Sequence, residues 1–297
     1  MLRDVNGILL VDKPQGATSN EVLQFVKRLF RAKKAGHTGS LDPIATGMLP
    51  ICFGFATKFS QFLLNADKHY IVTGKLGEIT ASEDREGEVV AKYEVTNIDA
   101  HAIENILPKF RGKVLQTPPM YSVLKHKGQP LYKLARQGIT VARHPREITI
   151  YTLQLLTVNG EFFKLVMRCS KGTYVRTVVS DIGKMLGCGA HVTDLRRLAV
   201  GPYQAGAMLP LAELQKLSYQ ELDKFLLPLE SMLTNMPQLI LARDMICHIQ
   251  QGQPLLLPNA PASGWIKIVD TTGKFLGVGE IMPDGKVNPR KIINAKH

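Results

Sequence analysis

The chain has 297 residues, 45% of them hydrophobic, which is enough for one large folded domain followed by a smaller one. Its 37 Lys and Arg residues exceed its 25 Asp and Glu residues, and the resulting net charge of +12 favours a polyanionic partner, with nucleic acid first. The four cysteines form no CxxC pair, which excludes the usual zinc and dithiol motifs, and no apolar run approaches the ~18 residues of a membrane span.

The N-terminal region predicts a strand followed by a helix. Residues 7–11 are an apolar run that ends at a Lys-Pro turn, and Thr18 and Glu21 have the spacing of a capping box in front of apolar residues at helical intervals. The helix ends in four basic residues, namely Arg28, Arg31, Lys33 and Lys34. These charges suit the negative end of the helix dipole. They also precede the next loop closely, so they could instead bind phosphates there.

Residues 36–47 predict a loop that holds one carboxylate. Three glycines permit unusual backbone angles, and Pro43 biases Asp42 towards an extended conformation. Leu41 and Ile44 can shield the Asp42 carboxylate from bulk water, which strengthens its electrostatic effect. The alternative is that Asp42 caps a short helix with Pro43 at its first position. Spacing alone does not choose between the two.

The central region alternates strands and helices. The pattern predicts a strand over 47–53, a helix over 55–63 whose phenylalanines belong to the core, and a strand over 68–76. Two strands over 148–156 and 162–169 flank Asn159-Gly160, a type I′ hairpin signal. A helix begins near Val175 and ends at Gly187 and Gly189, and Arg176 lies at its start beside the apolar stripe.

Residues 118–146 form a basic segment that contains no Asp or Glu. A run of charge is usually a solvated surface. Because this segment lacks any opposite charge, we expect an insertion that contacts an anionic partner.

The pattern of apolar residues changes near residue 236. Residues 204–236 carry helical leucines, Asn235-Met236-Pro237 is a plausible boundary, and the remaining chain alternates short apolar runs with turn residues. This pattern predicts a small β-barrel.

The loop at 36–47 is similar to the GHTGxLDPxATG motif of the tRNA pseudouridine-55 synthases of the TruB type. The resemblance extends in the family's order through residues 7–14, 68–70, 118–125, 172–177 and 187–198. It implies an α+β pseudouridine synthase fold with a mixed, largely antiparallel sheet flanked by helices. It also implies a catalytic domain over 1–235, in which 118–146 grips tRNA, and a PUA-type RNA-binding domain over 237–297. The loop at 78–87 departs from the family's acidic Thr-Asp-Thr pattern at Ala81.

The resemblance also implies roles for individual residues. Asp42 matches the catalytic aspartate, Arg176 is its expected partner, and Tyr70 matches the tyrosine that stacks on the flipped uracil. Tyr174 and Leu195 match further substrate contacts, and His37 matches the histidine that inserts into the RNA loop. Without the family, packing in the core is the simpler account of both tyrosines. Arg196 and Arg197 are assigned to phosphates or salt bridges and not to the site.

The implied reaction needs no cofactor and no metal. One ionised carboxylate can attack C1′ as a nucleophile or remove a proton from C2′, and the sequence does not choose between these routes. Glycosidases ordinarily use a second carboxyl group to protonate their leaving group, whereas uracil leaves as a delocalised anion, so a single acid can suffice.

The expected partner is the T-arm stem-loop of tRNA, bound by a cytoplasmic monomer with no obligatory protein partner and no membrane association. Two alternatives stay open: a non-catalytic tRNA-binding or folding factor, and a guide-RNA-dependent synthase subunit. The chain ends without a lysine-rich tail, which favours the stand-alone enzyme.

Overall fold

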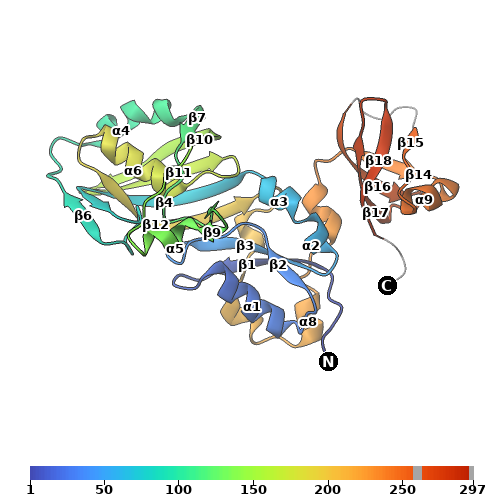
Figure 1. Cartoon of the computed structure of the whole chain (residues 1–297). Helices are drawn as coiled ribbons and strands as arrows, with labels where there is room; N and C mark the ends of the chain where they lie inside the picture. Colours follow the sequence, from blue (N-terminus) through green and yellow to red (C-terminus); the bar gives the residue numbers. More distant parts are fainter. Residues whose placement is uncertain (257–262, 294–297) are drawn as a thin grey trace.

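The computed structural model describes residues 1–256 and 263–293, which contain a large sheet and a small one (Figure 1). In these residues the large sheet has nine strands in the order β13-β1-β3-β12-β4-β11-β10-β7, with β2 beside β3. The pairs β1–β13 and β3–β12 are parallel and the others are antiparallel, as the family resemblance predicted. The nine strands are β1 Gly7–Lys13, β2 Ala35–His37, β3 Thr46–Phe53, β4 Lys68–Leu76, β7 Gly112–Gln116, β10 Arg146–Asn159, β11 Phe162–Cys169, β12 Ala190–Val200 and β13 Leu209–Pro210.

Helices and two small hairpins cover this sheet. The hairpins pair β5 Glu78–Thr80 with β6 Val89–Lys92, and β8 Lys125–His126 with β9 Gln129–Pro130. The α-helices are α1 Ser19–Leu29, α2 Ala56–Phe59, α3 Gln61–Asn65, α4 Ala100–Ile106, α5 Leu131–Ala135, α6 Val175–Met185, α7 Leu211–Leu214 and α8 Tyr219–Asp223. The described residues also contain three 3₁₀ helices: η1 Leu107–Phe110, η2 Ala205–Ala207 and η3 Leu229–Leu233.

The two long helices form where the sequence predicts them. The capping box of α1 is present, because Glu21 N donates to Thr18 Oγ1 and Thr18 N donates to Glu21 Oε2. Helix α6 buries Val178, Val179 and Ile182 against the same core as β4 and β12. This packing fixes the start of α6 over the middle of the sheet.

One local prediction holds in part, and another was wrong. The helix expected over 55–63 is two short helices, α2 and α3, separated at Ser60. The hairpin between β10 and β11 pairs Asn159 with Phe162, so its loop is Gly160-Glu161 and not Asn159-Gly160. Of these residues only Gly160 has a positive φ, of 57°, which fits a type II′ turn and not the predicted type I′ turn.

The C-terminal sheet has the order β14-β16-β17-β18-β15 in the described part of the chain, and it curls around one side of α9 Arg243–Gln250 (Figure 1). Its strands are β14 Gln238–Leu241, β15 Leu255–Leu256, β16 Gly264–Asp270, β17 Phe275–Ile281 and β18 Lys286–Ile292. The short strands of the β-rich tail are confirmed, whereas α9 was not predicted. Residues 257–262 and 294–297 of the predicted domain lie outside the described residues.

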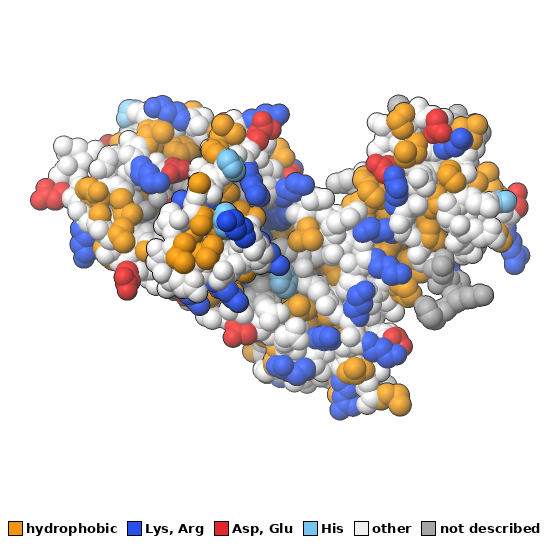
Figure 2. All heavy atoms as spheres, viewed as in Figure 1, with side chains coloured by type: hydrophobic (Ala, Val, Ile, Leu, Met, Phe, Trp, Pro, Cys, Tyr) orange, Lys and Arg blue, Asp and Glu red, His pale blue; other side chains and the backbone are white. Residues whose placement is uncertain are grey.

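Aromatic side chains join helices α2 and α3 to the C-terminal sheet. The ring centroids of Phe59 and Phe275 lie 5.6 Å apart, and those of Phe62 and Trp265 lie 5.2 Å apart, both in edge-to-face arrangements. These contacts belong to a core that residues of α2 and α3 share with β16 and β17. Figure 2 shows a hollow between the two parts, with Lys and Arg side chains on both of its sides.

Candidate active site

Hydrogen bonds to the backbone of the residues on either side fix the position of Asp42 in the loop between β2 and β3. The Ser19 hydroxyl accepts from Leu41 N at 2.7 Å and donates to Leu41 O at 3.0 Å. Pro43 O accepts from Gly16 N at 2.8 Å and from Lys13 Nζ at 3.2 Å. Within the described residues no helix begins at Asp42, so the loop interpretation is confirmed over the helix cap.

Lys13 is a buried cation beneath this loop. Its ammonium also donates to Pro14 O at 2.8 Å and to Ala17 O at 2.5 Å, and the residue is fully buried. Burial lowers the pKa of Lys13 to about 8, although the nearby Asp42 opposes the shift. Lys13 therefore ties the turn after β1 to the segment that carries the carboxylate.

Asp42 and Arg176 form an ion pair at the mouth of a cavity. Arg176 Nε donates to Asp42 Oδ2 at 2.8 Å and Nη2 donates to Oδ1 at 3.4 Å. The Arg176 side chain is 4% exposed and the Asp42 side chain 39% exposed. The arginine is therefore a fixed buried cation, while the carboxylate that it holds faces solvent.

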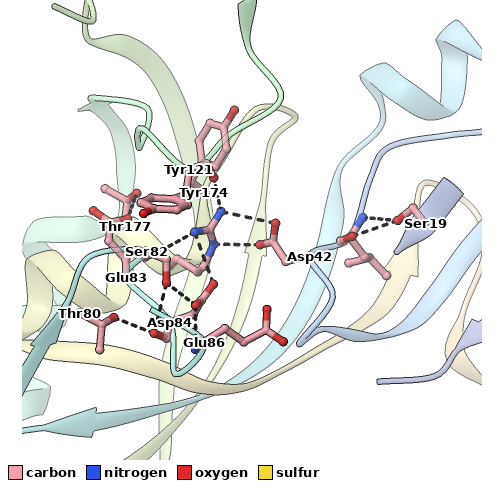
Figure 3. A network of polar contacts seen from close by, with 12 residues as sticks. Ser19, Asp42, Thr80, Ser82, Glu83, Asp84, Glu86, Tyr121, Tyr174 and Thr177 are labelled. Atoms are coloured by element: carbon pink, nitrogen blue, oxygen red, sulfur yellow. Dashed lines mark hydrogen bonds and ion pairs between the residues drawn. The ribbon is translucent and has the colours of Figure 1, made fainter. Parts of the chain in front are cut away.

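The rest of the Arg176 guanidinium is surrounded by acceptors, which Figure 3 draws as sticks. Nη1 donates to Ser82 O and lies 3.5 Å from Asp84 Oδ2, and Nη2 donates to Tyr121 O at 2.7 Å. In Figure 3, Asp42 and Asp84 come from different loops and approach the same guanidinium. Since every edge of the guanidinium is engaged, its orientation is fixed.

The cavity has a volume of about 220 Å³ and brings five of the six predicted site residues together. Its lining includes Asp42, Arg176, Tyr70, Tyr174 and Leu195. In the described part of the chain, Asp42 is the single carboxylate of this lining, which fits chemistry based on one acid. The sixth residue, His37, ends β2 outside the lining.

The two tyrosines face the cavity from different elements. Tyr70 lies on β4, is 8% exposed and pairs across the sheet with Arg197 of β12, while Tyr174 directly precedes α6. Burial raises the pKa of both phenols, so both are neutral at neutral pH. A neutral aromatic ring beside a carboxylate provides a stacking surface that adds no further charge.

Family models cover almost the whole chain. Residues 27–175 match the TruB family pseudouridylate synthase N-terminal domain, residues 176–234 match the tRNA pseudouridylate synthase B C-terminal domain, and residues 237–293 match the pseudouridine synthase II TruB C-terminal model. The chain belongs to the TruB family of pseudouridylate synthases.

Full-length TruB relatives agree with this membership. The chain is 53% identical over 298 residues to the tRNA pseudouridine synthase B of Coxiella burnetii (strain Dugway 5J108-111), covering 99% of this chain and 96% of the relative. It is 50% identical to that of Ectopseudomonas mendocina, covering 98% and 96%. A solved Cbf5–Nop10–Gar1 complex shares the fold, with a TM-score of 0.77 at 24% identity over 96% of this chain and 84% of that chain.

The sequence did not reveal three further residues around this cavity and its ion pair. Asp84 stands in the loop that departs from the family pattern, where several acidic residues compete and none is marked by spacing. Arg197 was left out of the site, yet it is 1% exposed, donates from Nε to Met48 O at 2.7 Å and from Nη2 to Gly39 O at 3.1 Å, and lines the cavity. Ser122 stands in the motif at 118–125, without a signal that distinguishes it from its neighbours.

The basic segment at 118–146 has secondary structure of its own. It contains the β8–β9 hairpin and α5, and Arg143 Nη1 closes its base by donating to Pro118 O at 3.0 Å. Its exposed cations are Lys125, Lys127, Lys133, Arg136 and Arg146. Among all the described residues, no helix is long and apolar enough to cross a membrane.

Proposed function

We propose that this chain is a tRNA pseudouridine synthase that isomerises the uridine at position 55 in the T-arm loop of tRNA. The observation that carries the proposal is the half-exposed Asp42 carboxylate at the mouth of a cavity lined by two tyrosines, held by a buried arginine. Membership of the TruB family and full-length relatives named tRNA pseudouridine synthase B support the same reaction.

The target uridine must leave its stack before it can reach Asp42. Extrusion costs a few kcal/mol, and stacking on an aromatic side chain returns ~1–3 kcal/mol per base. Tyr70 supplies that surface, Tyr174 and Leu195 confine the base, and His37 fills the space that the uridine vacates in the RNA loop. The location of His37 outside the cavity fits contact with the RNA around the extruded nucleotide.

Asp42 then acts on the sugar of the flipped nucleotide. Its carboxylate either attacks C1′ or removes the C2′ proton, the N1–C1′ bond breaks, the uracil turns, and C5 bonds to C1′ as the bond from C1′ to Asp42 breaks or the proton returns to C2′. C5 then loses its proton to water and N1 takes one up, so the product is an isomer of the substrate. Arg176 holds the carboxylate in a set orientation before the reaction begins, so little reorganisation is needed in the transition state. No cofactor enters this scheme, because the base that leaves is the base that returns.

RNA binding is assigned to the two parts that flank this site. We assign residues 1–235 to catalysis, with 118–146 gripping the T-arm, and residues 237–297 to a PUA-type RNA-binding domain. The cations of the insertion and those along the hollow provide the anionic partner with its binding surface (Figure 2). The protein acts as a cytoplasmic monomer without an obligatory protein partner.

Incubation of the purified protein alone with an unmodified tRNA transcript, followed by mapping of pseudouridine, tests the proposal. The expected result is pseudouridine at position 55 of the transcript, with no guide RNA and no other protein added. Modification that requires a guide RNA and partner proteins would instead favour a role like that of the Cbf5 complexes, whose fold this chain shares. Tight tRNA binding without any pseudouridine would leave only a binding or folding factor.

A further inference from the structure

Ser122 places a buried hydroxyl in the wall of the cavity. The residue is 5% exposed and belongs to the same lining as Asp42 and Tyr70. Within the described residues, Ser122 Oγ makes no hydrogen bond of ordinary geometry, although the Tyr174 hydroxyl lies near enough to interact with it. A buried hydroxyl that lacks such a bond destabilises the folded protein, so its presence at this place calls for a cause other than folding.

The backbone around Ser122 is fixed relative to the catalytic pair. Ser122 N donates to Met120 O at 2.9 Å, and Ser122 O accepts from Tyr132 N of α5 at 3.0 Å. The preceding residue, Tyr121, accepts from Arg176 Nη2 through its carbonyl. The hydroxyl therefore keeps a set position with respect to the guanidinium that holds Asp42.

The neighbour of Ser122 in the cavity is also a hydroxyl. Burial raises the pKa of the Tyr174 phenol, and the nearby Ser122 hydroxyl opposes that shift. In the lining of the cavity, these two neutral groups lie on the wall that the basic insertion and the start of α6 form together.

Such a group suits the edge of a pyrimidine. Uracil presents two carbonyl oxygens, which accept hydrogen bonds, and one N3–H, which donates. A hydroxyl carries one donor and two acceptor lone pairs, so it can bond either kind of group by rotating its hydrogen. The uracil must turn during the proposed reaction, and a fixed amide or ammonium would match only part of that edge.

We propose that Ser122 is a further uracil-binding residue, whose hydroxyl bonds the polar edge of the extruded base and holds it during the isomerisation. The inference rests on the proposed function and adds a contact that the family motif at Asp42 does not supply. It also gives the basic insertion a direct part in the site, because the segment that grips the RNA carries the hydroxyl.

The test compares wild type with Ser122→Ala and Ser122→Cys in three measurements: the melting temperature, the Kd for tRNA, and the single-turnover rate of pseudouridine formation. For Ser122→Ala we expect an unchanged or raised melting temperature, a Kd within about twofold of wild type, and a rate lowered about 3- to 10-fold, the range of one neutral hydrogen bond. Ser122→Cys keeps the size of the side chain with a weaker donor, so its rate should fall between the two.

Three results would overturn the inference. A wild-type rate in Ser122→Ala shows that the hydroxyl does not bind the base. A melting temperature that falls together with the rate shows a structural role, and a weakened Kd with an unchanged rate shows a contact with the RNA outside the cavity. If the wild-type protein itself forms no pseudouridine, the proposed function fails, and that outcome is distinct from all three.

Discussion

Replacement of Asp84 by Asn tests whether the charge behind Arg176 matters for the chemistry. Asp84 Oδ1 accepts from Ser82 Oγ and from Glu86 N, while Oδ2 faces Arg176 Nη1 at 3.5 Å. In Asp84→Asn the remaining oxygen can keep the first two bonds, which turns the amide NH₂ towards the guanidinium. Arg176 then faces a donor in place of a carboxylate and loses one of the two charges that fix its position.

The size of the effect follows from the burial of this pair. At 3.5 Å the Coulomb attraction is about 5 kcal/mol for an effective dielectric constant of about 20, before the desolvation of both groups is counted. The side chains are 4% and 7% exposed, so little of it is screened by water. Because Arg176 keeps Asp42, we expect a net loss of about 1–3 kcal/mol in the free energy of unfolding. A slight turn of the guanidinium should lower the single-turnover rate by about 10- to 100-fold.

The matched control is Asp194→Asn. Asp194 pairs with Arg85 at 3.4 Å, nearly the same separation, but their side chains are 61% and 43% exposed. An exposed pair of this kind contributes only about 0.2–1 kcal/mol. The assay is pseudouridine formation with enzyme in excess over tRNA, together with thermal unfolding and Kd. If both variants react at the wild-type rate, or if their single-turnover rates fall by the same factor, the buried network has no special part in catalysis.

Three other changes test the parts around this network. Lys13→Met leaves three carbonyls without their donor and should cost about 1–3 kcal/mol of stability. Because the folded-state pKa of Lys13 is lowered to about 8, the unfolded chain binds more protons than the folded chain between pH 8 and 10.5. The free energy of unfolding of wild type should therefore rise relative to that of Lys13→Met as the pH rises through that window. A difference in free energy of unfolding that does not change with pH would contradict this. Gly47→Ala should unfold or inactivate the protein, since Gly47 has a φ of 98° and an added Cβ would lie 2.3 Å from Arg197 O. A melting temperature equal to that of wild type would refute this prediction. Lys127→Glu should weaken tRNA binding and reduce the slope of log Kd against log salt by about one, and an unchanged slope would remove this residue from the RNA surface.

Local signals in the sequence predicted the elements that hold the site. The capping box at Thr18, the apolar stripe of α6 and the Gly-rich loop around Asp42 each depend on neighbouring residues, so their structure follows from short-range chemistry. Motif resemblance then supplied the pairing of Asp42 with Arg176, which are 134 residues apart in the chain.

The residues that escaped prediction depend on distant partners. Asp84 is one of several acids in its loop, and only the approach of Arg176 from α6 distinguishes it. Arg197 shows no sequence sign of being buried, because its place depends on carbonyls at Gly39 and Met48. The turn at Gly160 lies one residue later than predicted for a similar reason. The register of β10 against β11 decides which residues form the loop, and the Asn-Gly pair does not.

The most direct test of the whole account is the single-turnover rate of pseudouridine formation at position 55 in Asp42→Asn. Asn keeps the size of the side chain, and the backbone bonds at Leu41 and Pro43 remain, so the loop should hold its form. The account predicts a Kd for tRNA within a few-fold of wild type and no detectable pseudouridine. Modification at the wild-type rate would contradict it.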